Sequence, residues 1–195
     1  MPQFALKWHM AFGARKPRVK TEYNEPLLYD YAIGALGRRM RSVNELRMLL
    51  RRKVADRSEY GTVLVETVLA RLREQKLLND AQFAEIFSAY RRDDKKFGKR
   101  RVVNELRTKG IKADVIDTAL SETYAEVDEE QQAREYLLRK RIKQPTDQKQ
   151  TARVFRGLMG AGFSAKIIFG ILKHWNVKDE IITALDDAGD EIENP

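Results

Sequence analysis

The sequence predicts an all-α protein built as an elongated array of three tandem three-helix repeats. No proline lies between Leu27 and Gln144, and this tract is rich in Leu, Ala, Arg, Glu and Lys, which form helices readily. Apolar residues in the tract recur at helical spacing, as in Phe83, Phe87 and Tyr90. Because a three-helix unit of about 45 residues has too small a core of its own, the units are expected to stack on their neighbours.

An internal repeat indicates the number of units. The segment Val-Asn-Glu-Leu-Arg begins at Val43 and occurs again, identically, from Val103. A weaker third copy begins at Arg153 and overlays the segment that starts at Arg101, with Gly110 aligned to a second glycine. Duplication explains both matches, so three copies of one unit are expected.

Each copy is expected to contain three helices, which can be placed in order along the chain. They are predicted at 27–39, 42–53 and 59–76, then at 80–95, 99–109 and 113–123, and finally at 128–143, 147–161 and 164–175. The β-branched cluster from Thr62 to Val65 could form a short strand. A helix is favoured there because the apolar pattern continues through Leu72.

Capping residues justify several of these helix ends. Ser42 and Glu45 have the spacing of a capping box, which marks a helix start. Gly110 and Gly162 stand where a helix is expected to end with a left-handed residue. Ser164 follows as the expected N-cap of the ninth helix.

These elements divide the chain into five segments. The first is a flexible basic arm, which mixes aromatic, Gly, Pro and basic residues without a helical period. Three three-helix repeats follow, and the last segment is a short helix with an acidic tail that contains no Lys or Arg. The predicted boundaries are 1–26, 27–77, 78–126, 127–178 and 179–195.

Composition excludes several classes of function. The 195 residues include 37 Lys and Arg against 29 Asp and Glu, no Cys and two His, so disulfide scaffolds, thiol catalysis and Cys- or His-rich metal sites are not expected. No phosphate-loop, dinucleotide-binding or nucleophile-elbow motif occurs, and no apolar run approaches the roughly 20 residues of a membrane span. We expect a cytoplasmic, monomeric, non-enzymatic protein without metal or cofactor, whose net charge of +8 favours a polyanionic partner.

Basic residues gather on or beside the middle helices of the first two copies. They could form a repeated surface that follows a phosphate backbone or an acidic protein groove. They could also be solvated helix faces joined by pairs such as Arg41–Glu45 and Arg101–Glu105. The candidate binding residues are Arg38, Arg39, Arg41, Arg47, Arg51, Arg52, Lys53, Arg91, Arg92, Lys95, Lys96, Lys99, Arg100, Arg101, Arg107 and Lys109.

Four aromatic residues near these cations could stack on nucleic-acid bases. Tyr90 and Phe163 fall on apolar stripes, so a place in the core is predicted for both. Phe97 lies between two predicted helices and is expected to act as a packing plug. The fourth candidate is Trp175, at the end of the last predicted helix of the third copy.

From about Tyr31 to Trp175, the chain resembles the bacterial regulatory protein RecX family. The resemblance is carried by ALGRRMRSVNELRMLLRRK (35–53), VLARLREQKLLNDAQFAEIFSAYRR (68–92), GKRRVVNELRTKGIKADVIDTAL (98–120) and GFSAKIIFGIL (162–172). Two features depart from the family pattern. Val54 follows Lys53 where the family has glycine, and Gly157 and Gly160 interrupt a helix that is regular in the family.

The resemblance implies tandem three-helix repeats and a protein that binds the RecA recombinase filament on DNA. It further implies inhibition of the ATP hydrolysis, strand exchange and coprotease activity of RecA in DNA repair and the SOS response, together with binding to single- or double-stranded DNA. In such a mechanism Arg47, Arg51, Arg100 and Arg107 would be central. The alternative is a general DNA-binding regulator of helix-turn-helix type without RecA involvement.

Overall fold

A computed structural model of the chain describes residues 22–54, 59–178 and 180–181. These residues contain the nine helices α1 (Glu25–Arg38), α2 (Val43–Lys53), α3 (Glu59–Glu74), α4 (Asp80–Asp93), α5 (Lys99–Thr108), α6 (Ala113–Thr123), α7 (Glu129–Arg139), α8 (Gln148–Gly160) and α9 (Ala165–His174). No strand occurs in the described ranges, so the all-α class is confirmed. The expected arm and acidic tail fall almost wholly outside the described residues.

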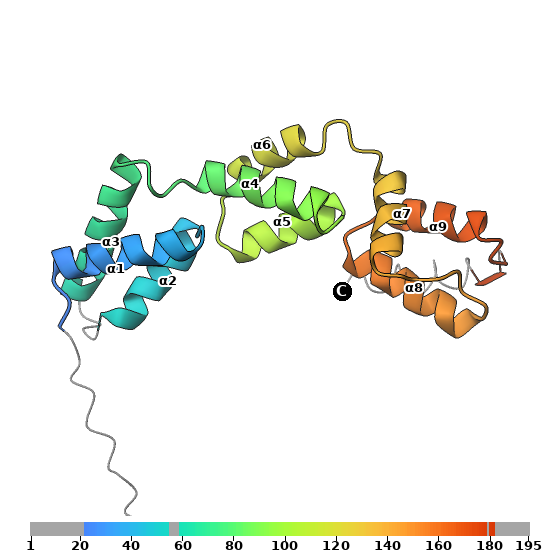
Figure 1. Cartoon of the computed structure of the whole chain (residues 1–195), viewed down its shortest axis with the longest axis horizontal. Coiled ribbons are helices and arrows are strands. Elements are labelled where there is room, and N and C mark those ends of the chain that lie inside the picture. Colours follow the sequence, from blue (N-terminus) through green and yellow to red (C-terminus); the bar gives the residue numbers. More distant parts are fainter. Residues whose placement is uncertain (1–21, 55–58, 179, 182–195) are drawn as a thin grey trace, which may run out of the picture.

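The helices lie in three groups of three along the long axis of the molecule (Figure 1). We call these groups unit 1 (α1–α3), unit 2 (α4–α6) and unit 3 (α7–α9). Most helix ends agree with the sequence prediction to within about two residues, and the segment from Thr62 to Val65 is helical. The exception is α7, which was expected to reach residue 143. It ends at Arg139 because Arg141 adopts a left-handed backbone, with φ 54°.

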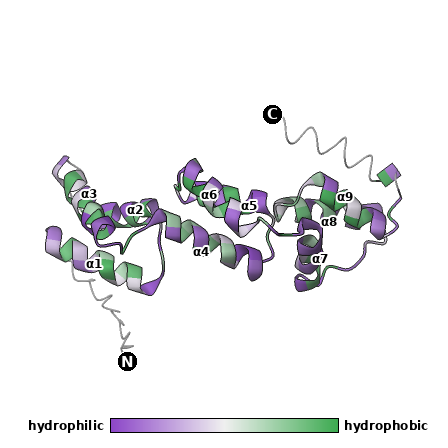
Figure 2. Cartoon of the chain, turned by 90° about the horizontal axis from the view of Figure 1, so that it is seen from above, coloured by the Kyte–Doolittle hydropathy of each residue, from purple (hydrophilic) through white to green (hydrophobic). Residues whose placement is uncertain are grey.

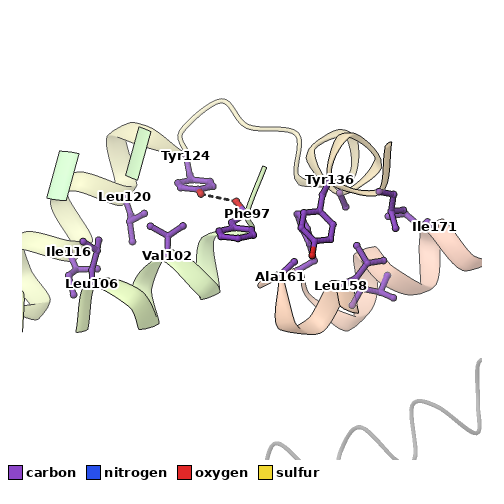
Figure 3. Close-up of a cluster of buried hydrophobic side chains, with 14 of the residues drawn as sticks. Phe97, Val102, Leu106, Ile116, Leu120, Tyr124, Tyr136, Leu158, Ala161 and Ile171 are labelled. Atoms are coloured by element: carbon purple, nitrogen blue, oxygen red, sulfur yellow. Dashed lines mark hydrogen bonds between the residues drawn. The ribbon is translucent and has the colours of Figure 1, made fainter. Parts of the chain in front are cut away.

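The buried residues form two separate hydrophobic cores. The core of unit 1 includes Leu46, Leu50 and Leu69, which are fully buried. A second core runs continuously through units 2 and 3 and includes Phe97 of unit 2 and Tyr136 of unit 3 (Figure 3). The ring centroid of Tyr136 lies 6.1 Å from that of Phe97 and 6.0 Å from that of Phe163. Apolar residues alternate with polar ones along the helices of every unit, as amphipathic helices require (Figure 2). No described helix is long and apolar enough to cross a membrane.

The middle helices α2, α5 and α8 meet end to end at both junctions between units. The N-cap residue of α2, Ser42, donates its hydroxyl to the carbonyl of Lys109, the C-cap residue of α5, at 2.7 Å. The N-cap residue of α5, Gly98, donates its N–H to the carbonyl of Ala161, the C-cap residue of α8, at 2.9 Å. An N-cap residue therefore meets a C-cap carbonyl at both junctions, through a side-chain hydroxyl at the first and a backbone N–H at the second, with the negative end of one helix dipole at the positive end of the next.

Gly110 and Gly162 make these two end-to-end contacts possible. Both follow the end of a middle helix with a positive φ, 76° and 94°, as the sequence predicted. A Cβ on Gly110 would lie 2.6 Å from the Cβ of Asn44, and a Cβ on Gly162 would lie 2.4 Å from the backbone nitrogen of Arg101. Each glycine therefore satisfies both a backbone conformation and a close approach to the preceding unit.

The structure corrects the repeat register inferred from the identical pentapeptide. Val43 is the first residue of α2, whereas Val103 is the fifth residue of α5, so the two copies are offset by about one helical turn. The buried residues give the structural register, because Leu50 of α2 takes the place of Leu106 of α5. In that register Arg51 corresponds to Arg107. The match of the third copy to the second, which aligns Gly162 with Gly110, agrees with the structure.

One expectation about a single side chain was wrong, and three were confirmed. Tyr90 is 48% exposed rather than part of the core, and Arg91 and Lys95 lie over its ring. Ser164 occupies the N-cap position of α9, as expected, without a side-chain capping hydrogen bond. Phe163 is fully buried, and Phe97 is a buried plug whose carbonyl accepts the hydroxyl of Tyr124 at 2.8 Å.

Polar contacts add to the junction between units 1 and 2. Glu45 bonds to the ammonium of Lys109 at 2.8 Å and completes the capping box of α2, while the N–H of Val43 donates to Asp80 at 2.8 Å. Burial would raise the pKa of Glu45, but the hydrogen bond and charge of Lys109, the N–H of Ser42 and the charge of Arg39 together lower it. A carboxyl whose pKa is lowered on folding stabilises the folded state above its ordinary pKa, and the contribution is lost as the pH falls.

Gly162→Ala should destabilise the protein by roughly 3 kcal/mol, since the side chain adds backbone strain of about 1–2 kcal/mol to a steric overlap at the junction. Gly157→Ala is the matched control. This glycine lies inside α8, and a Cβ there would meet no atom within 4 Å, so alanine should stabilise the helix by about 0.5–1 kcal/mol. Urea unfolding followed by circular dichroism measures both. Equal effects of the two substitutions would contradict the role given to Gly162.

Glu45→Gln should weaken the junction between units 1 and 2 and lower the free energy of unfolding at neutral pH. The difference from the wild type should disappear in acid. The carboxylate is charged and paired at pH 7 in the wild type. Because folding lowers the pKa of Glu45, the folded wild type becomes neutral at this position, like the variant, only as the pH falls below the ordinary carboxyl pKa of 4.5 and through the lowered pKa of the folded state. Denaturant unfolding of the two proteins between pH 7 and pH 3 measures the difference. A difference that stays constant over this range would show that the charge of Glu45 has no part in the junction.

Candidate functional site

The outward face of α5 carries the exposed part of the predicted basic surface. Val102 and Leu106 turn into the core, and this places Arg100, Asn104 and Arg107 on the exposed side, as their spacing predicted. On α2, the residue in the same register as Arg107 is Arg51, which is also exposed. Equivalent positions of two successive units therefore present a guanidinium to solvent.

Two of the four residues expected to be central approach Glu66 of α3: the Nη2 of Arg51 lies 4.0 Å from its Oε1, and Arg47 lies closer. The guanidinium of Arg47 donates two hydrogen bonds to Glu66, from Nε at 2.7 Å and from Nη2 at 3.1 Å. The hydrogen bond from Arg47 lowers the pKa of Glu66, and the bond to Glu66 raises the pKa of Arg47. This bidentate pair joins α2 to α3 within unit 1, so Arg47 has a structural contact of its own.

A groove of about 620 Å³ lies where unit 2 meets unit 3, and several predicted cations line it. The carboxylate of Glu105 lies between two of them, with its Oε2 2.7 Å from the Nε of Arg91 and its Oε1 3.0 Å from the Nε of Arg101. Arg101 also donates to the carbonyl of Gly160 at 2.9 Å and lies over the ring of Phe97 at 3.8 Å from its centroid. Arg101 thus joins unit 2 to unit 3, whereas Arg91 pairs with Glu105 within unit 2. The expected Arg101–Glu105 pair is confirmed.

The other expected pair, Arg41–Glu45, is wrong. Arg41 donates from Nε to the carbonyl of Ala35 at 3.3 Å, which closes the turn between α1 and α2. Glu45 pairs with Lys109, and more distantly with Arg39 at 3.7 Å, because the end-to-end packing of α2 and α5 brings Lys109 within reach.

The cations in the last turn of α4 and in the segment that follows it also pair with acidic residues. Arg92 bonds to Asp93 at 2.6 Å, and this bond raises the pKa of Arg92 and lowers that of Asp93. Lys95 lies 2.7 Å from Asp94, and Lys96 lies 2.8 Å from Glu135 of α7. Exposed candidates are concentrated at the end of α1, the end of α2 and the outward face of α5: Arg38, Arg39, Arg51, Arg52, Lys99, Arg100 and Arg107.

A second basic cavity, which the sequence did not predict, lies between units 1 and 2. Its volume is about 410 Å³, and its lining includes Arg73, Lys76 and Lys112. These residues belong to the end of α3, the turn after it and the residue before α6, so they are far apart in the sequence. The basic residues in the last turn of α3 could have indicated part of this cavity, but nothing in the sequence places Lys112 beside them.

The described residues contain no group of His, Cys, Asp or Glu side chains that could hold a metal ion. Acidic side chains at the α6–α7 connection line a third cavity of about 560 Å³ together with Arg92 and Lys96.

Known proteins share this arrangement. The family described as RecX, second three-helix domain, matches residues 79–120, which include α4, α5 and most of α6. A solved structure, "Crystal structure of regulatory protein RecX", superposes with a TM-score of 0.61 at 25% identity and covers 77% of this chain and 71% of that chain.

Curated relatives extend the match over most of the chain. The regulatory protein RecX of Halalkalibacterium halodurans is 35% identical over 129 residues, which are 66% of this chain and 42% of the relative, so the chain spans less than half of that protein. The regulatory protein RecX of Cronobacter sakazakii is 35% identical over 154 residues, which are 76% of this chain and 92% of the relative. By fold, repeat organisation and sequence, the chain belongs to the RecX family of regulatory proteins.

Proposed function

We propose that the chain is a non-enzymatic negative regulator of the RecA recombinase. As a cytoplasmic monomer it binds the RecA–DNA filament and inhibits ATP hydrolysis, strand exchange and coprotease activity in DNA repair and the SOS response. The observation that carries this proposal is the row of three units, in which the exposed Arg51 of unit 1 and Arg107 of unit 2 occupy the same position of successive middle helices. The shared RecX name of its relatives supports the same role.

A row of similar units suits a filament as a target. A filament repeats its binding sites along one axis, so a second unit of the row binds at a high local concentration once the first has bound. Each exposed guanidinium contributes little alone, about 1 kcal/mol or less at a solvated surface. Several such contacts along one row combine into a strong and reversible attachment, and the attached protein would obstruct changes in the filament that hydrolysis and strand exchange require.

The face on α5 is the part of the row expected to contribute most. Arg100, Asn104 and Arg107 follow one another on a single exposed stripe of a helix that both junctions hold in place. Two of the three are arginines, which bind carboxylates and phosphates in a bidentate manner. The stripe can therefore contact either the acidic side chains of a protein groove or the DNA backbone.

The experiment is a titration of single-strand-dependent ATP hydrolysis by RecA with the wild type and with Arg100→Ala/Arg107→Ala. The wild type should lower hydrolysis at less than one molecule per RecA subunit. The variant should need roughly tenfold more protein for half inhibition, since two interface charges contribute about 1.4 kcal/mol together. Lys166→Ala/Lys173→Ala, which removes two exposed charges of α9, is the matched control and should inhibit like the wild type.

Two outcomes would contradict the proposal. Unchanged hydrolysis at an excess of wild-type protein would exclude RecA inhibition. If the protein then bound duplex DNA with sequence preference in a mobility assay, it would be a DNA-binding regulator without RecA involvement. Equal weakening by both double variants would show that net charge, rather than the α5 face, determines inhibition.

A further inference from the structure

The cavity between units 1 and 2 brings together cations from three segments. Arg73 lies in the last turn of α3, Lys76 in the turn that follows, and Lys112 directly before α6. All three side chains are exposed. The end-to-end contact of α2 with α5 places them around one recess of about 410 Å³, which we call the junction cleft.

The cations of the junction cleft are not used to hold the fold together. Among the described residues, none of the three has an acidic partner within the 4.0 Å that defines a salt bridge, whereas Arg91 and Arg101 at the other junction both pair with Glu105. One carboxylate lines the cleft, that of Asp80, and its Oδ1 accepts the N–H of Val43 at 2.8 Å. The cleft therefore keeps a surplus of positive charge in a fixed place.

The backbone of the cleft is well defined. Lys76 has a left-handed conformation with φ 58°, its N–H donates to the carbonyl of Arg73 at 2.9 Å, and the N–H of Leu77 donates to the carbonyl of Leu72 at 2.9 Å. This is the hydrogen-bonding pattern of a Schellman motif, which prefers glycine at the left-handed position. A lysine at this position places a charge at the mouth of the cleft at some cost in backbone strain.

The lining favours a phosphodiester backbone over a peptide. Val43 and Leu78 are buried and Val115 is half-buried, so the cleft offers no exposed apolar pocket of the kind that anchors a protein partner. Binding there would depend on charge alone, and charge neutralisation dominates the affinity of proteins for nucleic-acid backbones. Lysine ammonium groups, which are compact point charges, are suited to phosphate.

We infer that the junction cleft binds the phosphodiester backbone of a nucleic-acid strand through Arg73, Lys76 and Lys112. The inference deepens the proposed function and rests on it only for the origin of the strand, which would be the DNA of the RecA filament. The cleft is then a DNA contact distinct from the α5 face, and a strand bound in it contacts units 1 and 2 at once.

The test is a fluorescence anisotropy titration of a labelled oligothymidine single strand, repeated over a series of NaCl concentrations. The wild type is compared with Arg73→Gln/Lys76→Gln/Lys112→Gln, which keeps the side-chain stems and removes three charges. The slope of log K against log salt is negative, and each neutralised phosphate adds about 0.7 to its magnitude. Removing three charges should therefore make the slope shallower by roughly 2. The control Lys149→Gln/Lys166→Gln/Lys173→Gln removes three exposed charges from unit 3 and should leave the slope nearly unchanged.

Lys76→Gly separates binding from folding. Glycine suits the left-handed position, so this variant should be at least as stable as the wild type in a thermal melt. It should nevertheless bind the oligonucleotide more weakly, and the slope of log K against log salt should be shallower by about 0.7. Wild-type affinity in this variant, or equal losses in the two triple variants, would overturn the inference.

Competition identifies the ligand chemistry. Replacing NaCl by sodium phosphate at equal ionic strength should leave the difference between wild type and triple variant in place, since a strand offers several linked phosphates. Loss of that difference would indicate a site for an isolated phosphate, and displacement of the strand by polyglutamate from the wild type alone would indicate an acidic protein partner; either result overturns the inference.

Because ATP hydrolysis by RecA is not measured in this experiment, a negative result leaves the proposed RecA inhibition standing. If the cleft is confirmed while hydrolysis is unaffected, only the proposed function fails.

Discussion

The end-to-end contact of the middle helices is the constraint on which the rest of the structure depends. A hydrogen bond from an N-cap residue to a C-cap carbonyl occurs at both junctions, from Ser42 to Lys109 and from Gly98 to Ala161. Each contact requires a residue without a side chain just after the helix end, which explains Gly110 and Gly162. Repeating one contact adds units along one direction, so the chain extends as a row (Figure 1).

The two junctions are nevertheless stabilised differently. Between units 2 and 3 the apolar core is continuous through Phe97 and Tyr136, whereas unit 1 has a core of its own and meets unit 2 through polar contacts such as Glu45–Lys109. Arg91 and Arg101 at the second junction pair with Glu105, while the cations of the α5 face and of the junction cleft are exposed. The distribution of charge available for binding therefore follows from how each junction is built.

Much of this fold could be predicted from the sequence, because helix periodicity and capping are local properties. The nine helices and the left-handed glycines were correctly placed on that basis. The register of the repeat could not be predicted, since an identical pentapeptide outweighed the buried pattern that aligns Leu50 with Leu106. Of the candidate site, the α5 stripe was predictable from its spacing, but the pairing of Arg47 with Glu66 and the grouping of Lys112 with Arg73 depend on contacts between distant segments.

The central claim is that two equivalent junctions fix three units in one row, and a distance across both junctions tests it most directly. The chain contains no cysteine, so single cysteines at the exposed positions Thr67 of α3 and Lys166 of α9 can be spin-labelled without other changes. Pulsed electron–electron double resonance should give one narrow distribution of the distance between the two labels, and Gly162→Ala should broaden or shift it. A broad distribution in the unaltered chain, indifferent to that substitution, would contradict the account.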